Sequence, residues 1–376
     1  MTVAASASPR PRVVVADDSA LMRRLVGDVL TRGGFDVVAT ARDGDEALRE
    51  CRHHRPDAMT LDLSMPGMGG IDVLKALREE SLELPVVVVS AFSPAQGAYA
   101  VDALAEGAFE LVTKPTGLAD APVFEQTLLG RVTLAVTSRR HPAALRLAPA
   151  PAAAPVPKPL DAPWRRALAA AKQATPPAPV ARAPRASTRG AKVVLIAIST
   201  GGPKALAALL PQLPSPLGLG TMIVQHMPAG FTASLADRLN RASKLTVKEA
   251  AGAEVLNPGV VLLAPGGRHL RMDDAGLTQL SDDDPIGGLR PRADLTIEDA
   301  ARRHGDRLLL VVMTGMGQDG LRGAQAVREH GGRILAEAEE TCTVYGMPRA
   351  VAEAGLVDRV EPLHALAGAI AEEAGS

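Results

Sequence analysis

The sequence predicts two α/β domains, each built on a mainly parallel sheet and separated by a linker rich in alanine and proline. First, the 376 residues exceed the size at which one hydrophobic core usually stops growing. Second, apolar residues make up 47% of the chain and aromatic residues only 2%, which suits buried parallel strands covered by helices. Third, short β-branched runs alternate with helical segments along residues 11–139 and again along residues 191–372.

The first domain is expected to be a doubly wound sheet of five parallel strands. Short apolar runs predict strands at residues 13–16, 37–39, 58–61, 86–89 and 109–113. Apolar residues at helical spacing predict helices at residues 20–30, 45–51, 71–80, 95–106 and 122–136. A strand followed by a helix, five times in succession, is typical of a parallel sheet with helices on both faces.

Residues 140–190 are predicted to form an extended linker. Alanine and proline dominate this stretch, and repeated prolines block both helices and sheet ladders. The one tryptophan of the chain, Trp164, lies here. We interpret its surroundings as a short helical turn that contacts a domain surface transiently, and the alternative is a dedicated docking anchor.

The second domain is expected to be doubly wound and mostly parallel, with one β-hairpin. The predicted strands are residues 193–198, 222–224, 245–248, 260–263, 308–312 and 333–336. The predicted helices are residues 203–210, 231–239, 294–303 and 321–329. Residues 269–272 and 277–280, joined by a short turn, read as the hairpin.

Composition also excludes several classes of protein. The formal net charge of −1 gives no long-range field that would gather nucleic acid or an anionic membrane. The two cysteines, Cys51 and Cys342, form neither a disulfide framework nor a zinc pattern, so we expect reduced thiols. Residues 1–12 lack the apolar stretch of a signal peptide, and no apolar run is long enough to span a membrane, so we expect a cytoplasmic protein.

Polar residues follow four strands of the first domain, at the edge where open α/β sheets bind ligands. They are Asp17 and Asp18 after the first strand, Asp62 after the third, Ser90 after the fourth and Lys114 after the fifth. Three converging carboxylates need a cation, and their hard oxygen atoms suit Mg²⁺. With Lys114 this cation would neutralise a phosphoryl group on Asp62, to which the Ser90 hydroxyl would bond. Each acidic residue could instead only cap the next helix.

The stretches Ala16-Asp17-Asp18-Ser19, Leu61-Asp62-Leu63-Ser64-Met65-Pro66-Gly67, Ser90-Ala91 and Thr113-Lys114-Pro115 resemble the receiver domains of two-component response regulators. The resemblance covers the whole first domain. It implies that Asp62 accepts phosphate from a histidine kinase. It also implies that Asp18, Asp62 and the Ser64 carbonyl bind Mg²⁺, with Asp17 behind them. Gly69 stands where receivers often carry aspartate, on the solvent side of the pocket.

The second domain begins with a buried strand that turns abruptly into a helix at Ser199-Thr200-Gly201-Gly202-Pro203. Glycines permit the tight turn, and Pro203 suits the first turn of a helix. A serine in this position presents its hydroxyl near free backbone N–H groups, as a nucleophile beside oxyanion donors would. A simple helix cap and a phosphate-binding loop are the alternatives.

Two more polar residues follow strands of the second domain. His226 comes directly after residues 222–224 and Gln225, and Asp319 lies in the glycine-rich loop after residues 308–312. Either one alone has an ordinary interpretation, as a structural histidine and a helix N-cap. Because a parallel sheet brings its strand ends to one edge, Ser199, His226 and Asp319 could supply nucleophile, base and orienting carboxylate. Their order along the chain differs from that of α/β-hydrolases.

The stretches Ile198-Ser199-Thr200-Gly201-Gly202-Pro203, Gln225-His226-Met227-Pro228 and Thr314-Gly315-Met316-Gly317-Gln318-Asp319-Gly320 resemble the catalytic motifs of the chemotaxis protein-glutamate methylesterases. Ala264-Pro265-Gly266 and Pro291-Arg292-Ala293-Asp294 resemble this family too, and a receiver domain ahead of the catalytic domain is its arrangement. The family often carries glycine where Ala197 stands and serine where Arg292 stands, and the second difference bears on contacts at the substrate side.

This resemblance implies a phosphorylation-activated esterase that acts on methyl-accepting chemotaxis receptors and gives glutamate and methanol. Ser199 would attack the ester, His226 would take the serine proton, and Asp319 would fix the imidazole tautomer. Backbone N–H groups of Met316 and Thr200 would hold the oxyanion. The implied partners are the receptors, which give contact with the membrane only indirectly, and a histidine kinase. The esterase would need no cofactor. Deamidation of receptor glutamine uses the same acyl chemistry.

Two other functions fit parts of the sequence. A receiver joined to a DNA-binding domain would require a short helical module with a basic recognition helix, and the second domain is long, α/β and without a basic stripe. A nucleotide-binding domain would use residues 199–204 as a phosphate loop. Their spacing matches neither common glycine-rich nucleotide motif.

Overall fold

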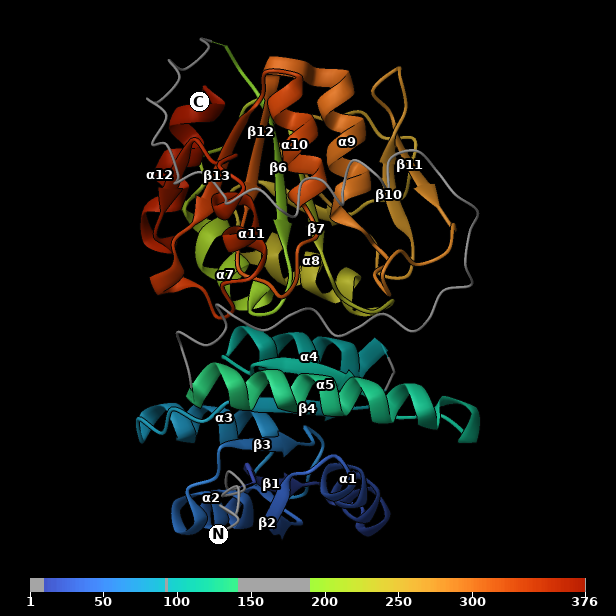
Figure 1. Ribbon diagram of the computed structural model, residues 1–376, viewed down its shortest axis with the longest axis vertical. Coiled ribbons are helices and arrows are strands. Elements are labelled where there is room, and N and C mark those ends of the chain that lie inside the picture. The colour runs from blue at the N-terminus through green and yellow to red at the C-terminus, as the bar shows by residue number, and fades with distance from the viewer. Residues whose placement is uncertain (1–9, 92–93, 141–189, 376) are drawn as a thin grey trace, which may run out of the picture.

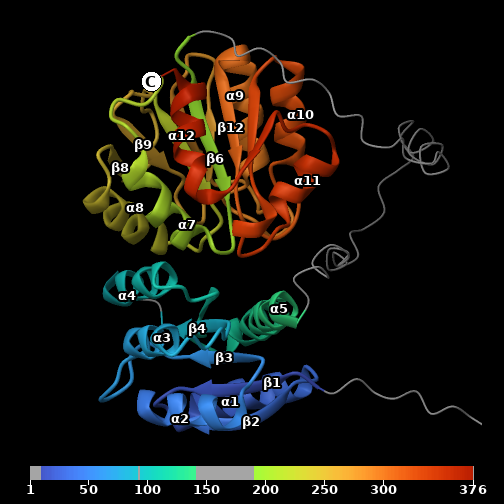
Figure 2. The ribbon, with the colours of Figure 1, turned by 90° about the vertical axis from the view of Figure 1, so that its left-hand side faces the viewer.

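The computed structural model describes residues 10–91, 94–140 and 190–375. These residues form two α/β domains, which Figures 1 and 2 show stacked along the long axis of the molecule. Most of the predicted linker, including Trp164, lies outside the described residues.

The first domain is a sheet of five strands in the order β2-β1-β3-β4-β5, with every pair parallel, as predicted. Its strands are β1 (Arg12–Ala16), β2 (Asp36–Ala41), β3 (Ala58–Leu61), β4 (Val86–Ser90) and β5 (Glu110–Thr113). Its helices are α1 (Ala20–Arg32), α2 (Gly44–His54), α3 (Gly70–Glu79), α4 (Pro94–Ala105) and α5 (Ala121–Arg140). The central strands β3 and β4 are buried along their whole length, which explains why they are mostly apolar.

Local sequence signals fix where the helices of the first domain begin. The Ser19 hydroxyl accepts a hydrogen bond from the Met22 N–H at the start of α1. The Asp43 carboxylate does the same for the Glu46 N–H at the start of α2. Capping at these two helices therefore belongs to Ser19 and Asp43, which leaves the carboxylates of Asp18 and Asp62 available at the sheet edge.

The second domain is a parallel sheet of seven strands in the order β14-β13-β12-β6-β7-β9-β8. Its strands are β6 (Val193–Ile198), β7 (Thr221–Gln225), β8 (Thr246–Glu249), β9 (Val260–Leu263), β12 (Leu308–Val312), β13 (Arg333–Glu337) and β14 (Arg359–Glu361). Its helices are α7 (Gly202–Leu209), α8 (Phe231–Ala242), α9 (Ala293–His304), α10 (Leu321–Glu329), α11 (Met347–Glu353) and α12 (Leu363–Ala374). Helices cover both faces, so the predicted doubly wound class is confirmed (Figure 1).

The structure extends the predicted elements of the second domain in two ways. The predicted hairpin is present as β10 (His269–Met272) and β11 (Thr278–Ser281), but it forms a separate two-stranded antiparallel sheet. Three elements near the C-terminus, α11, β14 and α12, were not predicted. The last of them continues to Ala374, two residues past the predicted end of the domain at residue 372.

The two domains pack through α4 of the first and through α7 and α8 of the second (Figures 1 and 2). One continuous cluster of buried apolar side chains includes Val101 and Leu104 of α4 together with Phe231 and Leu235 of α8. Gly97 lets the helices approach, because a Cβ atom there would lie 3.3 Å from the Ser234 hydroxyl. The first domain therefore rests on the second domain through a buried apolar surface.

No helix among residues 10–91, 94–140 and 190–375 is long and apolar enough to cross a membrane. Both cysteines are free thiols, as predicted. Burial raises the pKa of the Cys51 thiol to about 12, so this side chain is an apolar core residue at neutral pH.

Candidate functional site

The three predicted catalytic residues lie at the carboxyl ends of neighbouring strands. β12, β6 and β7 are adjacent at the centre of the seven-stranded sheet. Ile198 at the end of β6 pairs with Gln225 at the end of β7, so the next residues, Ser199 and His226, leave the sheet together. Asp319 comes from the loop after β12, on the other side of β6. The sheet order therefore brings all three loops to one edge.

Ser199 lies in the turn between β6 and α7 and is only 7% exposed. Its backbone N–H donates to the Thr314 carbonyl oxygen at 2.9 Å. The N-cap of α7 is Gly201, which has φ +81° and sits where a Cβ atom would overlap the Thr343 side chain. Ser199 is therefore not the N-cap of α7, and interpreting its hydroxyl as a helix cap is wrong.

A buried glutamine connects the loop of Ser199 to the loop of His226 by hydrogen bonds. The Gln225 side-chain Nε2 donates to the backbone carbonyl oxygens of Ser199 and His226, at 3.0 Å each. Gly202 gives this side chain room, because a Cβ atom there would collide with the Gln225 amide oxygen. Sequence analysis did not single out Gln225 as a site residue, although it stands directly before His226 in the recognised motif. It acts on the backbone of the site and so fixes the spacing of two loops.

His226 and Asp319 form a buried pair. Nε2 of His226 lies 2.7 Å from Oδ2 of Asp319, and the two side chains are 6% and 1% exposed. In the neutral ring the proton must therefore be on Nε2, where it is donated to the carboxylate. Nδ1 then carries the lone pair, and it is buried without a hydrogen-bond partner among the described residues. The atom left available as a base is Nδ1.

Asp319 is held as a carboxylate by donors from the start of α9. The backbone N–H groups of Ala293 and Asp294 donate to its two oxygens at 2.7 and 2.9 Å. Burial acts against the charge, but the hydrogen bond from His226 and the charges of His226 and Arg292 hold the pKa of Asp319 well below its usual range. Asp319 therefore stays ionised, and it is not the N-cap of α10, which is Gly320.

The hydroxyl of Ser199 forms no hydrogen bond with His226 in the part of the chain that the structure describes. Sequence analysis predicted a full triad, and the structure brings together the His226–Asp319 half of it by a direct hydrogen bond. The other half consists of two residues that leave paired strand ends side by side. Hydrogen bonds at a catalytic nucleophile are often long without substrate and shorten when it binds.

Two backbone N–H groups near Ser199 are free to bind an oxyanion. Those of Thr200 and Met316 donate to no acceptor among the described residues. The loop of Met316 lies against Ser199, because a Cβ atom on Gly315 would be 2.6 Å from Ser199 Cβ. The Gly315 N–H itself is occupied by the Val344 carbonyl oxygen. The predicted donors therefore remain unpaired while their neighbours are fixed.

Thr314 and Glu337 hold this loop, and sequence analysis missed both. The Thr314 hydroxyl donates to the Thr200 carbonyl oxygen at 3.0 Å. The Thr314 N–H donates to the Glu337 carboxylate at 2.9 Å, and burial raises the pKa of Glu337. Their partners are backbone groups of other loops, so no spacing in the sequence could have revealed them.

The first domain covers this edge of the seven-stranded sheet. A cleft of about 460 Å³ is lined by β5 and α5 on one side and by residues 225–228 on the other. Across it, the Thr200 hydroxyl donates to the Glu110 carboxylate at 2.7 Å, and Arg131 lies 3.2 Å from the same carboxylate. Val344, which holds Gly315, belongs to a buried apolar cluster of the first domain that includes α5. The first domain thus contacts residues on both sides of Ser199.

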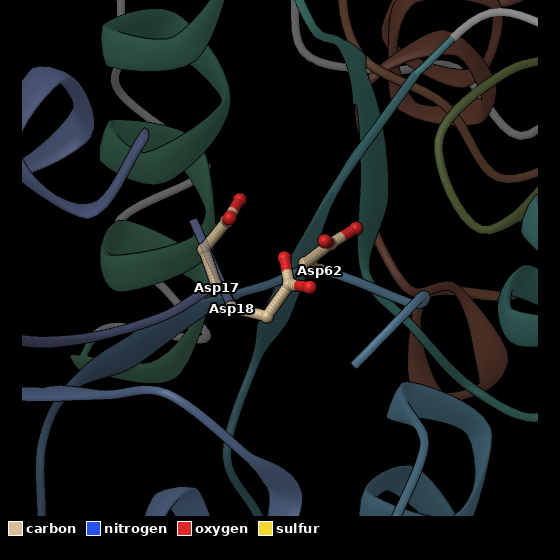
Figure 3. Close-up of side chains that lie close together, drawn as sticks. All are labelled: Asp17, Asp18 and Asp62. Atoms are coloured by element: carbon tan, nitrogen blue, oxygen red, sulfur yellow. The ribbon is translucent and has the colours of Figure 1, made fainter. Parts of the chain in front are cut away.

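A second candidate site lies at the strand ends of the first domain. Carboxylate oxygens of Asp17, Asp18 and Asp62 all lie within 4.8 Å of one another (Figure 3). Nζ of Lys114 lies 2.8 Å from Asp17 and 2.9 Å from Asp62. Burial raises the pKa of Asp17 despite Lys114, and hydrogen bonds to both aspartates raise the pKa of Lys114 despite burial. One ammonium thus contacts two of the three clustered carboxylates, and this oxygen-rich site fits Mg²⁺.

The two serines predicted for this pocket differ in position. The Ser64 N–H donates to Asp62 Oδ1 at 3.4 Å, which places the Ser64 backbone beside the acceptor carboxylate. Ser90 is the last residue of β4 and is buried. Its hydroxyl donates to the Ala91 carbonyl oxygen at 3.4 Å, and among the described residues it has no hydrogen bond to Asp62. A bond from this hydroxyl to a phosphoryl oxygen on Asp62 stays a prediction.

Comparisons with known proteins cover both domains. The CheB methylesterase family matches residues 194–370, and the response regulator receiver domain family matches residues 13–121. The protein-glutamate methylesterase/protein-glutamine glutaminase 5 of Myxococcus xanthus is 41% identical, over 94% of this chain and 95% of its own length. The Bacillus subtilis protein of this description is 37% identical over 96% and 97%. The solved CheB methylesterase catalytic domain of Thermotoga maritima is 42% identical, covering 49% of this chain and 98% of its own, with a TM-score of 0.47.

Proposed function

The chain belongs to the CheB methylesterase family and carries a receiver domain ahead of the catalytic domain, and we propose that it demethylates chemoreceptors through Ser199, His226 and Asp319. Its activity is that of a protein-glutamate methylesterase and protein-glutamine glutaminase. The substrate under this proposal is a methyl-accepting chemotaxis receptor. One observation carries the assignment of the triad: the buried His226–Asp319 pair leaves Nδ1 unpaired next to the strand end of Ser199.

The proposed reaction begins with attack of the Ser199 hydroxyl oxygen on the ester carbonyl carbon. His226 Nδ1 takes the hydroxyl proton, and Asp319 stabilises the resulting imidazolium through Nε2. The N–H groups of Thr200 and Met316 bind the negatively charged oxygen of the tetrahedral intermediate. The imidazolium proton goes to the methoxy oxygen as the carbon–oxygen bond breaks, so methanol leaves and an acyl-enzyme remains.

Water completes the cycle. His226 takes a proton from water, the hydroxide attacks the acyl carbon, and the proton returns to Ser199 as glutamate is released. A glutamine side chain enters the same sequence with ammonia as the leaving group. The direct test is whether the full-length protein releases methanol from methylated receptor membranes and whether this release needs Ser199.

We also propose that the unphosphorylated receiver inhibits the esterase by covering it. The contacts that support this are the buried surface of α4 on α8 and the hydrogen bond between Glu110 and Thr200. Thr200 is both the residue after the nucleophile and a proposed oxyanion donor. Arg238 of the second domain and Asp102 of the first also form an ion pair. A receptor glutamate could reach Ser199 only after these contacts open.

Replacing Glu110 with glutamine is expected to raise the activity of the unphosphorylated protein on the order of 10-fold. The change removes a charged hydrogen bond across the closed interface, which typically contributes about 1.5–3 kcal/mol, and leaves the catalytic residues unaltered. The measurement is methanol release from receptor membranes without a phosphodonor. Glu125→Gln is the matched control, because Glu125 pairs with Arg32 within the receiver and should leave the rate unchanged.

Removal of residues 1–185 extends this test, and it should also raise the basal rate. If neither Glu110→Gln nor the truncated protein is faster than wild type, inhibition by covering is wrong. The proposed triad would stand even then, because its evidence lies wholly within the catalytic domain.

Phosphorylation of Asp62 is the proposed signal for opening. Asp18, Asp62 and the Ser64 carbonyl would hold Mg²⁺, with Asp17 behind them, and the ion would offset the charge of the incoming phosphoryl group. Lys114 connects this site to the interface, because its Nζ contacts Asp62 and its residue also lines the cleft beside His226. A phosphoryl group must favour the open arrangement over the closed one for the signal to pass.

Asp62→Asn is expected to abolish activation by a small phosphodonor such as acetyl phosphate while leaving basal activity near wild type. The amide cannot form the acyl phosphate, whereas the catalytic domain is untouched. Asp45→Asn serves as the control, since Asp45 is an exposed carboxylate in the first turn of α2. Full activation of the Asp62→Asn protein, with Mg²⁺ and phosphodonor present, would show that another residue receives the signal.

The proposed partners are therefore a histidine kinase and the cytoplasmic segments of chemoreceptors. The protein would work in the cytoplasm and reach the membrane only through the receptors. Neither a DNA-binding output domain nor a nucleotide-binding loop is supported, because the whole of the second domain matches a methylesterase family.

A further inference from the structure

Arg292 lies directly against the carboxylate of the proposed triad. It is the N-cap residue of α9, and its side chain is 19% exposed. Nε lies 2.9 Å from Asp319 Oδ1, as an ion pair without the alignment of a hydrogen bond. Nη2 donates to Asp294 Oδ2 at 2.7 Å, and Nη1 donates to the Ile286 carbonyl oxygen at 3.2 Å. Each of the three guanidinium nitrogens therefore has a partner, and the partner of Nε is Asp319.

The backbone of Arg292 is held in place as well. The Arg292 N–H donates to Nδ1 of His269 at 3.1 Å, and His269 is fully buried. Although burial acts against its charge, the hydrogen bond to Asp294 and the charge of Asp319 raise the pKa of Arg292. Arg292 is thus a permanent positive charge, held in place on the side of Asp319 away from His226 Nε2.

The carboxylate of Asp319 therefore interacts with both His226 and Arg292. Its Oδ2 faces His226, while its Oδ1 faces the guanidinium of Arg292 and the backbone N–H groups of Asp294 and Gly320. A positive charge at this distance offsets part of the negative charge that would otherwise stabilise a protonated imidazole. A triad with an uncharged residue at position 292 would give the imidazolium the full benefit of the carboxylate.

We propose that Arg292 is a positioning residue that weakens the support Asp319 gives to protonated His226, so that the base remains unprotonated at lower pH. The inference rests on the proposed function for its consequence in the reaction, but the charge effect belongs to the three side chains themselves. Its expected signature is an acid limb of the pH–rate profile that lies at lower pH than it would with a neutral residue in place of Arg292.

Other charged groups near the pair come from both domains. Within the catalytic domain, Asp294 and Glu298 of α9 are on the same side as Arg292 and contribute to its electrostatic environment. From the receiver, Glu110 and Arg131 line the cleft beside His226, together with Lys114 and Asp120. Receiver groups move away when the domain opens, so the measurement must be made with the receiver in one defined state. The contribution of Arg292 is intrinsic to the catalytic domain and persists in that state.

A purely structural role for Arg292 is the alternative. It ties the loop of Ile286 to Asp294, and Asp294 in turn accepts the N–H groups of Gly320 and Gly323 at 2.9 Å each. Loss of these ties would lower activity at every pH by similar factors. Only a charge effect would move the midpoint of the pH profile, and only a neutral replacement would move it.

The experiment compares Arg292→Gln and Arg292→Lys in the full-length protein with Mg²⁺ and acetyl phosphate present throughout. Glutamine is neutral but can still donate to Asp294, whereas lysine keeps the charge. Arg271→Gln is the matched control, because Arg271 pairs with Asp299 of α9 and touches neither Asp319 nor His226. The first readout is the titration of the His226 ring by NMR with carbon-labelled histidine, assigned by its absence in His226→Gln. The second is the pH profile of kcat/KM for methanol release.

In Arg292→Gln, both the ring titration and the acid limb should move up by about one pH unit, while Arg292→Lys and Arg271→Gln stay near wild type. Below the limb this shift appears as about a 10-fold loss of activity relative to wild type. A folded Arg292→Gln protein whose ring titration coincides with that of wild type would overturn the inference, and so would an equal shift in Arg292→Lys. If no variant or wild type released methanol but the ring titration shifted as expected, the proposed function would fail while the charge effect stood.

Discussion

Replacing Ser199 with alanine is expected to lower methanol release from methylated receptors by about 10⁴-fold or more. Without the hydroxyl no acyl-enzyme can form, and only oxyanion binding and substrate positioning remain to assist direct attack by water. Folding should be unaffected, because the Ser199 hydroxyl has no hydrogen bond to His226 and caps no helix. The measurement is the initial rate with phosphodonor present, using receptors that carry labelled methyl groups.

Ser243→Ala is the matched control for this variant. Ser243 is also a serine whose oxygen serves the backbone, since it accepts the Leu245 N–H at the end of α8, far along the chain from the site. It should retain a rate close to wild type. Methanol release by Ser199→Ala within about 10-fold of wild type would remove the serine from the reaction and leave the His226–Asp319 pair without a nucleophile to serve.

Replacing Asp319 with asparagine should cost about 10⁴-fold in kcat, with a small change in KM. Asp319 fixes the proton on Nε2 of His226. The oxygen of an asparagine side chain could still accept this hydrogen bond, but it would carry no negative charge to stabilise the imidazolium. The three backbone N–H groups that now point at the carboxylate would also face an NH₂ group on one side. Both effects place the imidazole proton on the wrong nitrogen or turn the ring.

Asp299→Asn separates loss of the triad from loss of a buried charge in general. Asp299 is another buried carboxylate, on α9, and it accepts from Arg271 and from the Met272 N–H. Both variants are expected to be less stable to heat, but only Asp319→Asn should lose catalysis. Equal losses of activity in the two folded proteins would mean that Asp319 acts through stability alone.

Much of the architecture could be predicted because each signal was local. The buried strands β6 and β12 are unbroken apolar runs, and their bounds were predicted to the residue. β14 has only three residues, too few for any period to show. The hairpin was found from its turn, but its separation from the main sheet is decided by packing that no local pattern contains.

The side chains proposed for the triad could be picked out for a similar reason, since each one directly follows a strand or lies in the glycine-rich loop after one. The residues that hold these side chains in place could not be predicted. Gln225, Thr314 and Glu337 bond mainly to backbone groups, and the backbone of every residue offers such groups. The contact of Glu110 with Thr200 joins positions 90 apart in two domains. The sequence showed only that Arg292 differs from the serine common in the family, and its contact with Asp319 joins positions that no local pattern connects.

The central proposal is that the receiver domain covers Ser199, His226 and Asp319 at the edge of the seven-stranded sheet until Asp62 is phosphorylated. Methanol release by the purified full-length protein, from methylated receptor membranes with and without acetyl phosphate, tests this most directly. The account predicts slow release alone and much faster release with Mg²⁺ and phosphodonor. Absence of methanol in both conditions, from membranes that the Bacillus subtilis relative demethylates, would contradict it.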